Sequence, residues 1–253
     1  MKILLRIAFL GKAYCGYQVQ PNGITVQQRL NEAAKDLFGY DCDIVGCSRT
    51  DSGVHANEFY VAVSKKGESF IETSIPTEKI AQAMSVRLPN DISVLSANEV
   101  EDNFHPRYDV VCKEYVYQIW NGRARNPFLT DRSWHCPKPI DDDALERMQS
   151  AARMFIGKKD FASFMAADSK IKDSVRTVTD ASVTREGDLI TFKVSADGFL
   201  YNMVRIFTGT LIDVAYQRIR LEDIEDIIFA CDRKRAGATA PPEGLFLNKV
   251  VYK

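Results

Sequence analysis

The sequence lacks the features that mark membrane, secreted and metal-binding proteins. No apolar run approaches the roughly 20 residues that a membrane-spanning helix needs. The opening residues, Met1 to Arg6, lack the uninterrupted apolar region and cleavage site of a signal peptide. None of the six cysteines belongs to a Cys-x-x-Cys pair, and the closest spacing, Cys42 to Cys47, suits zinc poorly. We therefore expect a cytoplasmic protein with reduced thiols and no metal site.

A strong charge of either sign is also missing. The formal net charge is −1, so composition alone does not indicate a nucleic-acid partner. Residues 1–105 carry 10 Lys and Arg against 13 Asp and Glu, and the remaining residues carry 23 against 21. Any binding to nucleic acid must therefore come from local basic clusters.

The sequence does contain ample material for a buried core. The apolar fraction is 45% and the charged fraction 26%, both ordinary for a soluble globular protein. Its 253 residues fit one large domain or two of roughly 120 residues each.

Hydrophobic periodicity predicts the same order of elements in both halves of the chain. A helix is expected to begin after Thr25, with Gln28 completing a capping box, and to end at Gly39. The first half then reads as strands at 3–10, 41–47, 57–65 and 92–99 and helices at 25–39 and 77–88. The second half reads as strands at 110–120, 175–184, 189–196 and 245–252, a long helix after 141–143, and helices at 200–216 and 221–230.

This order predicts an α+β protein made of two ferredoxin-like (β-α-β-β-α-β) halves, residues 1–105 and 106–253. We expect the halves to form one extended, mostly antiparallel sheet with helices on one side. A central cleft over such a sheet would suit an extended polar ligand.

The loop between two predicted strands, residues 46–56 (GCSRTDSGVHA), is the segment most suggestive of chemistry. Small residues surround Asp51, with Arg49 two positions before it and His55 four positions after it. Such a loop can hold a carboxylate against a ligand with little steric cost. Asp, Ser and Gly also favour ordinary tight turns, and His55 by itself indicates a packed histidine. Composition alone leaves both interpretations open.

Five motifs in the same order resemble the TruA class of tRNA pseudouridine synthases. The loop around Asp51 is similar to that family's Gly-Arg-Thr-Asp-x-Gly-Val-His-Ala signature. The other four are YCGYQVQ at 14–20 with TVQ at 25–27, FHPRY at 104–108 with KEYVY at 113–117, FLYNMVR at 199–205, and APPEGLFL at 240–247. Departures at Cys47-Ser48 and at 215–218 leave the aspartate untouched. The resemblance spans nearly the whole chain.

The resemblance implies an isomerase that converts uridine to pseudouridine at positions 38, 39 and 40 of the tRNA anticodon stem-loop. It implies Asp51 as the nucleophile, Arg205 as the cation that pairs with it, and Tyr115 as a ring stacking on the target base. Leu245 would line the base pocket, and Arg49, Arg107 and Lys113 would bind the RNA. The family works without a metal or nucleotide cofactor and as a homodimer.

Two other classes of function remain as alternatives. A non-catalytic RNA-binding protein with RRM-type sheets would need a run of aromatic residues on a strand, which is missing. A hydrolase with paired carboxylates would need an acid near Asp51, and the nearest in sequence is Glu58, on a predicted strand.

Overall fold

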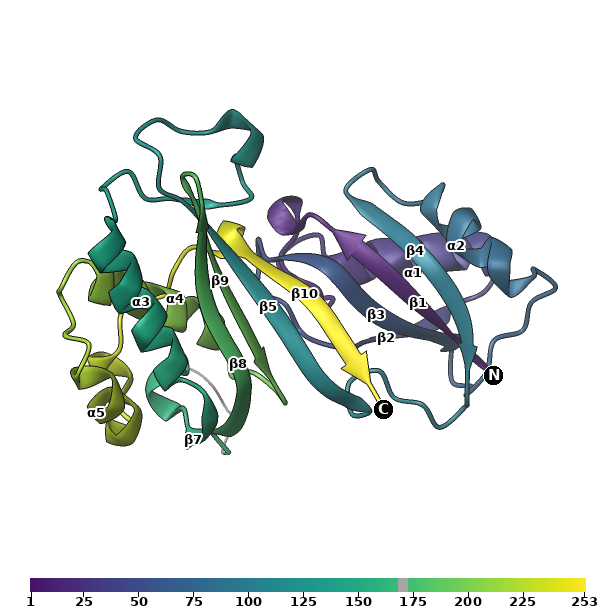
Figure 1. The fold of residues 1–253 in the computed structure, drawn as a ribbon. Coiled ribbons are helices and arrows are strands. Elements are labelled where there is room, and N and C mark those ends of the chain that lie inside the picture. Colours follow the sequence, from purple (N-terminus) through teal and green to yellow (C-terminus); the bar gives the residue numbers. More distant parts are fainter. Residues whose placement is uncertain (168–172) are drawn as a thin grey trace. The chain divides into compact units, whose positions relative to one another are not determined.

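A computed structural model describes residues 1–167 and 173–253, which form two compact units. Unit 1 comprises Met1–Val111 together with Phe246–Lys253, and unit 2 comprises Cys112–Leu245. The last strand therefore belongs with unit 1, whereas a division near residue 105 would assign it to the second half. Figure 1 shows the final strand of the chain in yellow.

Unit 1 has the predicted strand-helix-strand-strand-helix-strand order. Its elements are β1 (Lys2–Phe9), α1 (Val26–Phe38), β2 (Cys42–Gly46), β3 (His55–Lys65), α2 (Thr77–Ser85) and β4 (Ile92–Val100), with a short 3-10 helix η1 (Gly11–Ala13). β3 pairs antiparallel with both β1 and β2, and β1 pairs antiparallel with β4. Strand β10 (Leu245–Tyr252) adds in parallel to β3 through Phe246 opposite His55. The ferredoxin-like prediction for this half is confirmed.

Unit 2 follows the second predicted series of elements. They are β5 (Val110–Trp120), β6 (Trp134–His135), α3 (Asp142–Met154), β7 (Gly157–Asp160), β8 (Val175–Glu186), β9 (Leu189–Ala196), α4 (Met203–Ala215) and α5 (Asp223–Ala230), with 3-10 helices η2 (Pro127–Leu129), η3 (Ala162–Phe164), η4 (Arg233–Arg235) and η5 (Pro242–Gly244). The strands β5, β9, β8 and β7 pair antiparallel in that order. The α+β class with mostly antiparallel strands is therefore as predicted.

Side-chain caps fix where the predicted helices begin. The Thr25 hydroxyl accepts a hydrogen bond from the Gln28 N–H at 3.3 Å, which satisfies one free donor at the start of α1. Among the described residues, Gln28 does not return a bond to the Thr25 N–H, and its side-chain amide donates to Glu32 at 3.0 Å. α2 ends at Ser85 rather than at Leu88, and the chain continues in hydrogen-bonded turns to Pro89.

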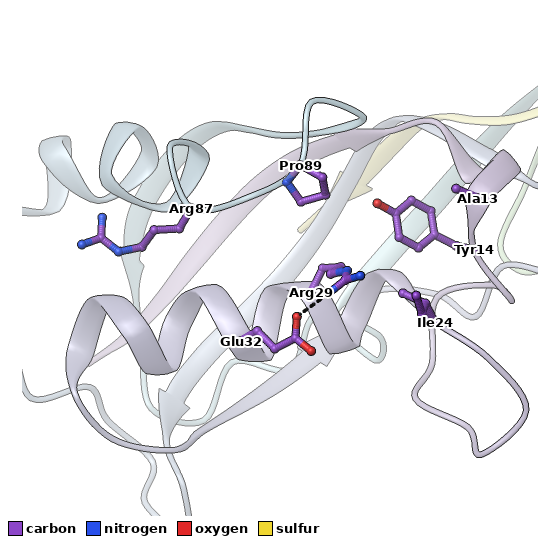
Figure 2. A pocket seen from close by; sticks show the side chains of 7 residues that line it. All are labelled: Ala13, Tyr14, Ile24, Arg29, Glu32, Arg87 and Pro89. Atoms are coloured by element: carbon purple, nitrogen blue, oxygen red, sulfur yellow. Dashed lines mark hydrogen bonds and ion pairs between the residues drawn. The ribbon is translucent and has the colours of Figure 1, made fainter.

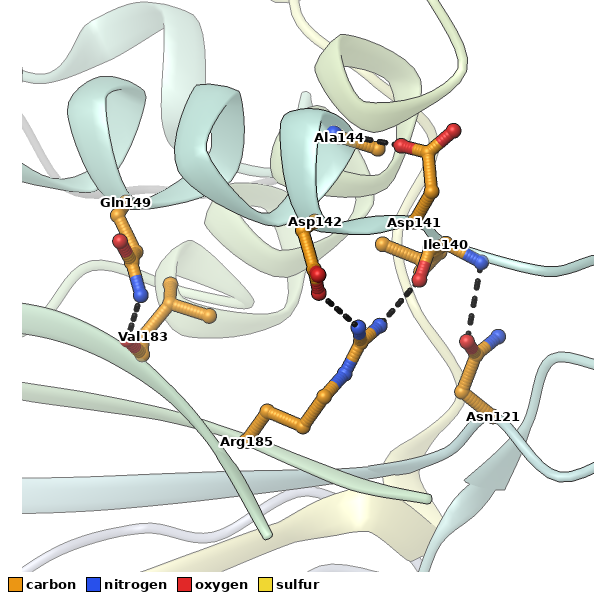
Figure 3. A network of polar contacts seen from close by, with 8 residues as sticks. All are labelled: Asn121, Ile140, Asp141, Asp142, Ala144, Gln149, Val183 and Arg185. Carbon is orange, nitrogen blue, oxygen red and sulfur yellow. Dashed lines mark hydrogen bonds and ion pairs between the residues drawn. The ribbon is translucent and has the colours of Figure 1, made fainter. Parts of the chain in front are cut away.

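Helix α3 is tied to the sheet of unit 2 by a network of polar contacts (Figure 3). The Asp141 carboxylate caps the helix by accepting from the Ala144 N–H at 2.8 Å. Arg185 on β8 pairs with Asp142 at 3.4 Å and donates to the Ile140 carbonyl. The Gln149 amide donates to the carbonyl of Val183, also on β8. These bonds fix the register of α3 along β8 at both its first and its second turn.

The core of unit 2 surrounds α4. Eleven of the thirteen residues of α4 are buried, so the helix is enclosed on almost all sides. Three phenylalanine rings from outside the helix, Phe155, Phe161 and Phe164, pack against Phe207 of α4. Burial on this scale makes α4 a rigid support for the side chains that it carries. Within residues 1–167 and 173–253, no helix has the length and apolar character needed to cross a membrane.

Candidate active site

The loop that carries Asp51 joins β2 to β3 in unit 1 and is held along its length by the segment before α1. The Tyr17 N–H donates to the Thr50 carbonyl at 3.3 Å, and the Gly53 N–H donates to the Tyr14 carbonyl at 3.3 Å. The Ser52 hydroxyl donates to the same Tyr14 carbonyl at 3.2 Å. The first and second recognised motifs therefore form one hydrogen-bonded structure.

A glycine allows this close contact. Gly16 has φ +80°, and a Cβ added to it would lie 2.5 Å from the Thr50 carbonyl oxygen. An L side chain would meet both a backbone strain and a steric clash at this position. At Thr50, one residue before Asp51, the loop therefore approaches Gly16 as closely as the backbone permits.

Asp51 itself lies at the turn of the loop and is half-buried. Its carbonyl accepts a hydrogen bond from the Val54 N–H at 3.2 Å, which closes the turn. The neighbouring Thr50 is buried, and its hydroxyl has no hydrogen-bond partner among the described residues. Asp51 therefore sits on a turn whose backbone is fixed on both sides.

His55 is a structural residue. Only 1% of its surface is exposed, and its Nδ1 accepts a hydrogen bond from the Gly11 N–H at 2.9 Å. Its ring stacks on Phe246 of β10, with 4.6 Å between the ring centroids. This arrangement matches the expectation of a packed, hydrogen-bonded histidine, and it locks the start of β3 directly after the Asp51 loop.

Tyr14, in the opening motif, anchors the other side of the loop, although no pattern in the sequence singles it out. Its hydroxyl donates to the Asp91 carboxylate at 2.6 Å, and burial is the main cause that raises its pKa above the ordinary range. Figure 2 shows it beside a hollow of about 280 Å³ that also contains the Arg29–Glu32 ion pair at 2.8 Å. Arg87, which also lines the hollow, pairs with Asp36, so both of its arginines are already engaged.

Arg205, in unit 2, is held in a defined orientation near the start of α4. Its Nε donates to the Ala240 carbonyl at 2.7 Å, and its Nη1 donates to the Asn202 side chain at 2.7 Å. The Ala240 N–H donates back to the Arg205 carbonyl at 3.1 Å. Arg205 is therefore a half-buried, oriented arginine that joins the late helix motif to the C-terminal motif.

The residues just before the C-terminal motif pack tightly onto α4. A Cβ added to Gly209 would lie 1.7 Å from the Ala238 carbonyl oxygen, and the Gly237 N–H donates to the Thr210 hydroxyl at 2.9 Å. This contact fixes the chain just before Leu245, which opens β10 and is 5% exposed.

Tyr115 lies on β5 and is 7% exposed, with its ring edge-on to Phe199 at 5.0 Å. Two residues later, the fully buried Tyr117 donates its hydroxyl to the Pro241 carbonyl at 2.7 Å. The central and C-terminal motifs are thereby joined within unit 2. Lys113 is on the same strand, opposite Ala196 of β9.

Arg49 and Arg107 are brought together in unit 1, although 57 residues separate them in the sequence. Both line a hollow of about 190 Å³ between the Asp51 loop and the turn of the FHPRY motif. The sequence-predicted residues are thus distributed over both units. Unit 1 contains Asp51, Arg49 and Arg107, and unit 2 contains Tyr115, Arg205, Lys113 and Leu245.

Two basic residues of unit 2, Arg233 and Arg176, serve the fold. Arg233 donates to the Ala236 and Gly237 carbonyls and to the Thr239 hydroxyl, and burial lowers its pKa. Arg176 donates to the carbonyls of Asp173 and Val175. Because these guanidinium groups donate hydrogen bonds to backbone carbonyls, fewer of their N–H groups remain to bind a phosphate.

The second carboxylate that a hydrolase would need already has partners within unit 1. Glu58 accepts from the Val250 N–H at 3.0 Å and pairs with Arg6 at 3.6 Å. In the described part of the chain, no cluster of three or more His, Cys, Asp or Glu side chains is suited to a metal ion.

Comparison with known proteins agrees with the motifs. A family model described as tRNA pseudouridine synthase matches residues 6–109 and 151–253. A tRNA pseudouridine synthase A of Thermoanaerobacter sp. (strain X514) is 40% identical over 250 residues, which cover 99% of both chains. The proteins of the same name from Acetivibrio thermocellus and Caldicellulosiruptor saccharolyticus are 41% and 42% identical, with the same coverage.

A solved structure, "Crystal Structure of a Cbf5-Nop10-Gar1 Complex", has a much weaker likeness. Its TM-score is 0.35 and its identity 13%, over 96% of this chain and 57% of that one. No part of the assignment depends on it.

Proposed function

This chain belongs to the tRNA pseudouridine synthase family, and from that premise we propose that it isomerises uridine to pseudouridine in the anticodon stem-loop of tRNA, at positions 38, 39 and 40, with Asp51 as the nucleophile. The observation that carries the proposal is the loop around Asp51. It has the family's signature, and its backbone is fixed by hydrogen bonds from Tyr17 and Gly53 on either side of the aspartate. A fixed carboxylate is what covalent catalysis requires.

The proposed reaction conserves every atom. The carboxylate of Asp51 attacks either C1′ of the sugar or C6 of the base, and the C1′–N1 bond breaks. The base turns, a C1′–C5 bond forms, the proton on C5 leaves to solvent, and N1 takes up a proton from solvent. The carboxylate then departs unchanged, so that neither an oxidant nor a metal is consumed.

Arg205 and Tyr115 have supporting roles in this proposal. Arg205 supplies a positive charge that favours the ionised form of the aspartate, since a nearby cation stabilises a carboxylate. Its orientation by Ala240 and Asn202 supports that role, because a guanidinium used as a counter-ion must be held in place. The buried ring of Tyr115 would stack on the target base, and Leu245 would close the base pocket.

The target uridine has to leave its stack to reach the aspartate. Extrusion costs a few kcal/mol, less at a loop or at the end of a stem. Arg49, exposed beside Asp51, and Arg107 and Lys113 would hold the flanking phosphates. The protein would act in the cytoplasm as a homodimer, a state that light scattering of the purified protein would test.

Tritium release tests the activity directly. The purified protein is incubated with tRNA that contains [5-³H]uridine, in EDTA and without added nucleotide. We expect release of the C5 tritium, and sequencing of the product should locate pseudouridine at positions 38 to 40. Absence of release from every tRNA tested would refute the activity, and a requirement for metal would refute the proposed chemistry.

A further inference from the structure

The hollow that contains Arg49 and Arg107 is not lined by Asp51. Its volume is about 190 Å³, and it lies wholly within unit 1. Ser48 and Arg49 form one wall, and His105, Arg107 and Tyr108 form another. This volume is below the roughly 300–1,000 Å³ of pockets for drug-sized ligands, and it fits a single planar group.

The charge of this hollow favours an anion. It is lined by Arg49 and Arg107, and no lining residue is an Asp or Glu. Among the residues that the structure describes, neither guanidinium takes part in an ion pair. A neighbouring hollow of about 620 Å³ contains Asp43 and Glu68, which repel an anion. In the hollow of Figure 2, Arg29 pairs with Glu32 and Arg87 pairs with Asp36.

An exposed ring stands at the rim of the hollow. Tyr108 is 74% exposed, and one face of its ring stacks on His105, with 4.2 Å between centroids and 29° between planes. The turn beneath is rigid, because the His105 N–H donates to the Asp109 carboxylate at 2.7 Å and the Tyr108 N–H donates to the His105 carbonyl. A fixed aromatic ring beside two cations is the arrangement that stacks a nucleobase and holds its phosphate.

The opposite wall carries an unpartnered polar group. Tyr17 lines the hollow and is 3% exposed, yet its hydroxyl has no hydrogen-bond partner among the described residues. This oxygen is enclosed by the protein, so it is not available to an occupant of the hollow. The wall is otherwise rigid, since the Gln27 side chain accepts from the Val19 N–H and donates to the Ile44 carbonyl.

From these observations we propose that the hollow binds the RNA nucleotide next to the target uridine, with its base on Tyr108 and its phosphate between Arg49 and Arg107. The inference rests on the proposed function. Arg49 and Asp51 are two residues apart, a span of at most about 7 Å, so an occupant here adjoins whatever the aspartate attacks. The site would let the protein hold the RNA strand while the neighbouring uridine is extruded.

Binding of an anticodon stem-loop RNA tests the stacking ring. In the Asp51→Asn protein, which does not turn over, Tyr108→Ala should raise Kd by about 5- to 150-fold. Tyr108→Phe keeps the ring and should bind as the parent does. Phe229→Ala is the matched control, because it removes an equally exposed ring, 81% exposed on α5. Thermal midpoints should be equal in all four proteins.

Two further measurements identify the occupant. Arg107→Gln should lower the slope of log Kd against log salt by about one, as expected for a lost phosphate contact. A stem-loop with 4-thiouridine on either side of the target should crosslink to the peptide that contains Tyr108. Parent-like affinity for Tyr108→Ala, an equal loss in Phe229→Ala, or no crosslink from either position would overturn the proposal.

The outcome is separable from that of the catalytic proposal. Tritium release by the wild-type protein is measured in the same preparation. Release together with parent-like affinity of Tyr108→Ala would refute the nucleotide site and leave the enzyme activity standing. No release by the wild-type protein would refute the activity itself.

Discussion

Replacing Gly16 by alanine tests whether the segment before α1 positions the loop that carries Asp51. Gly16 has φ +80°, and this left-handed conformation costs an alanine about 1–2 kcal/mol. The new Cβ would also lie 2.5 Å from the Thr50 carbonyl oxygen, an overlap whose relief costs about 1–3 kcal/mol more. The sum, about 2–5 kcal/mol, is below the roughly 5–15 kcal/mol that stabilises a folded domain. The variant should therefore fold and remain measurable.

Gly39→Ala is the matched control for this experiment. Gly39 has φ +79°, and nothing lies within 4 Å of an added Cβ. It should lose only the conformational part, about 1–2 kcal/mol. Urea unfolding followed by circular dichroism gives both losses, and tritium release gives kcat for the folded proteins. We expect Gly16→Ala to lower kcat because Thr50 precedes Asp51, and Gly39→Ala to leave kcat unchanged. Equal stability losses and equal turnover in the two variants would refute the reasoning.

Three other perturbations follow from the structure. Arg205→Lys keeps the charge but cannot bond both Ala240 and Asn202. It should therefore lower kcat and reduce the free energy of unfolding in urea by about 1–3 kcal/mol. Wild-type values of both would contradict the role of these bonds in orienting Arg205. Thr25→Ala removes the cap of α1 and should cost about 1 kcal/mol by the same assay, where no change would argue against the cap. Burial raises the pKa of the Cys42 thiol to about 11 and that of Cys136 to about 12, so iodoacetamide should label both slowly at pH 8, with Cys42 accelerating as pH approaches 11. Rapid labelling of either at pH 8 would show that burial does not protect it.

The fold was predictable wherever hydrophobic periodicity and local chemistry agreed. The cap at Thr25, the glycine stop at Gly39 and the alternation of β3 all specify structure through neighbours in the sequence. The short β6 and β7 were not predicted, because two and four residues are too few to show a period. The position of β10 beside β3 could not be predicted from local patterns either, because this pairing joins residues about 190 positions apart.

The site was predictable to a different degree. The motifs predict roles for Asp51, Arg49 and Arg205, and these roles stay predictions. The hydrogen bonds that orient these residues could not be predicted from motifs, because the bonds from Tyr17 to Thr50 and from Arg205 to Ala240 join separate segments of the chain. The shared hollow of Arg49 and Arg107 likewise became visible only in three dimensions.

The central claim is that the Asp51 carboxylate forms the covalent bond. The most direct measurement compares tritium release by the wild-type protein and by Asp51→Asn, alongside the Kd of each for tRNA. We predict that Asp51→Asn retains less than about a thousandth of the wild-type rate, the size of loss typical for a missing nucleophile, while its Kd stays close to the wild-type value. Residual activity above that level with intact binding would contradict the claim.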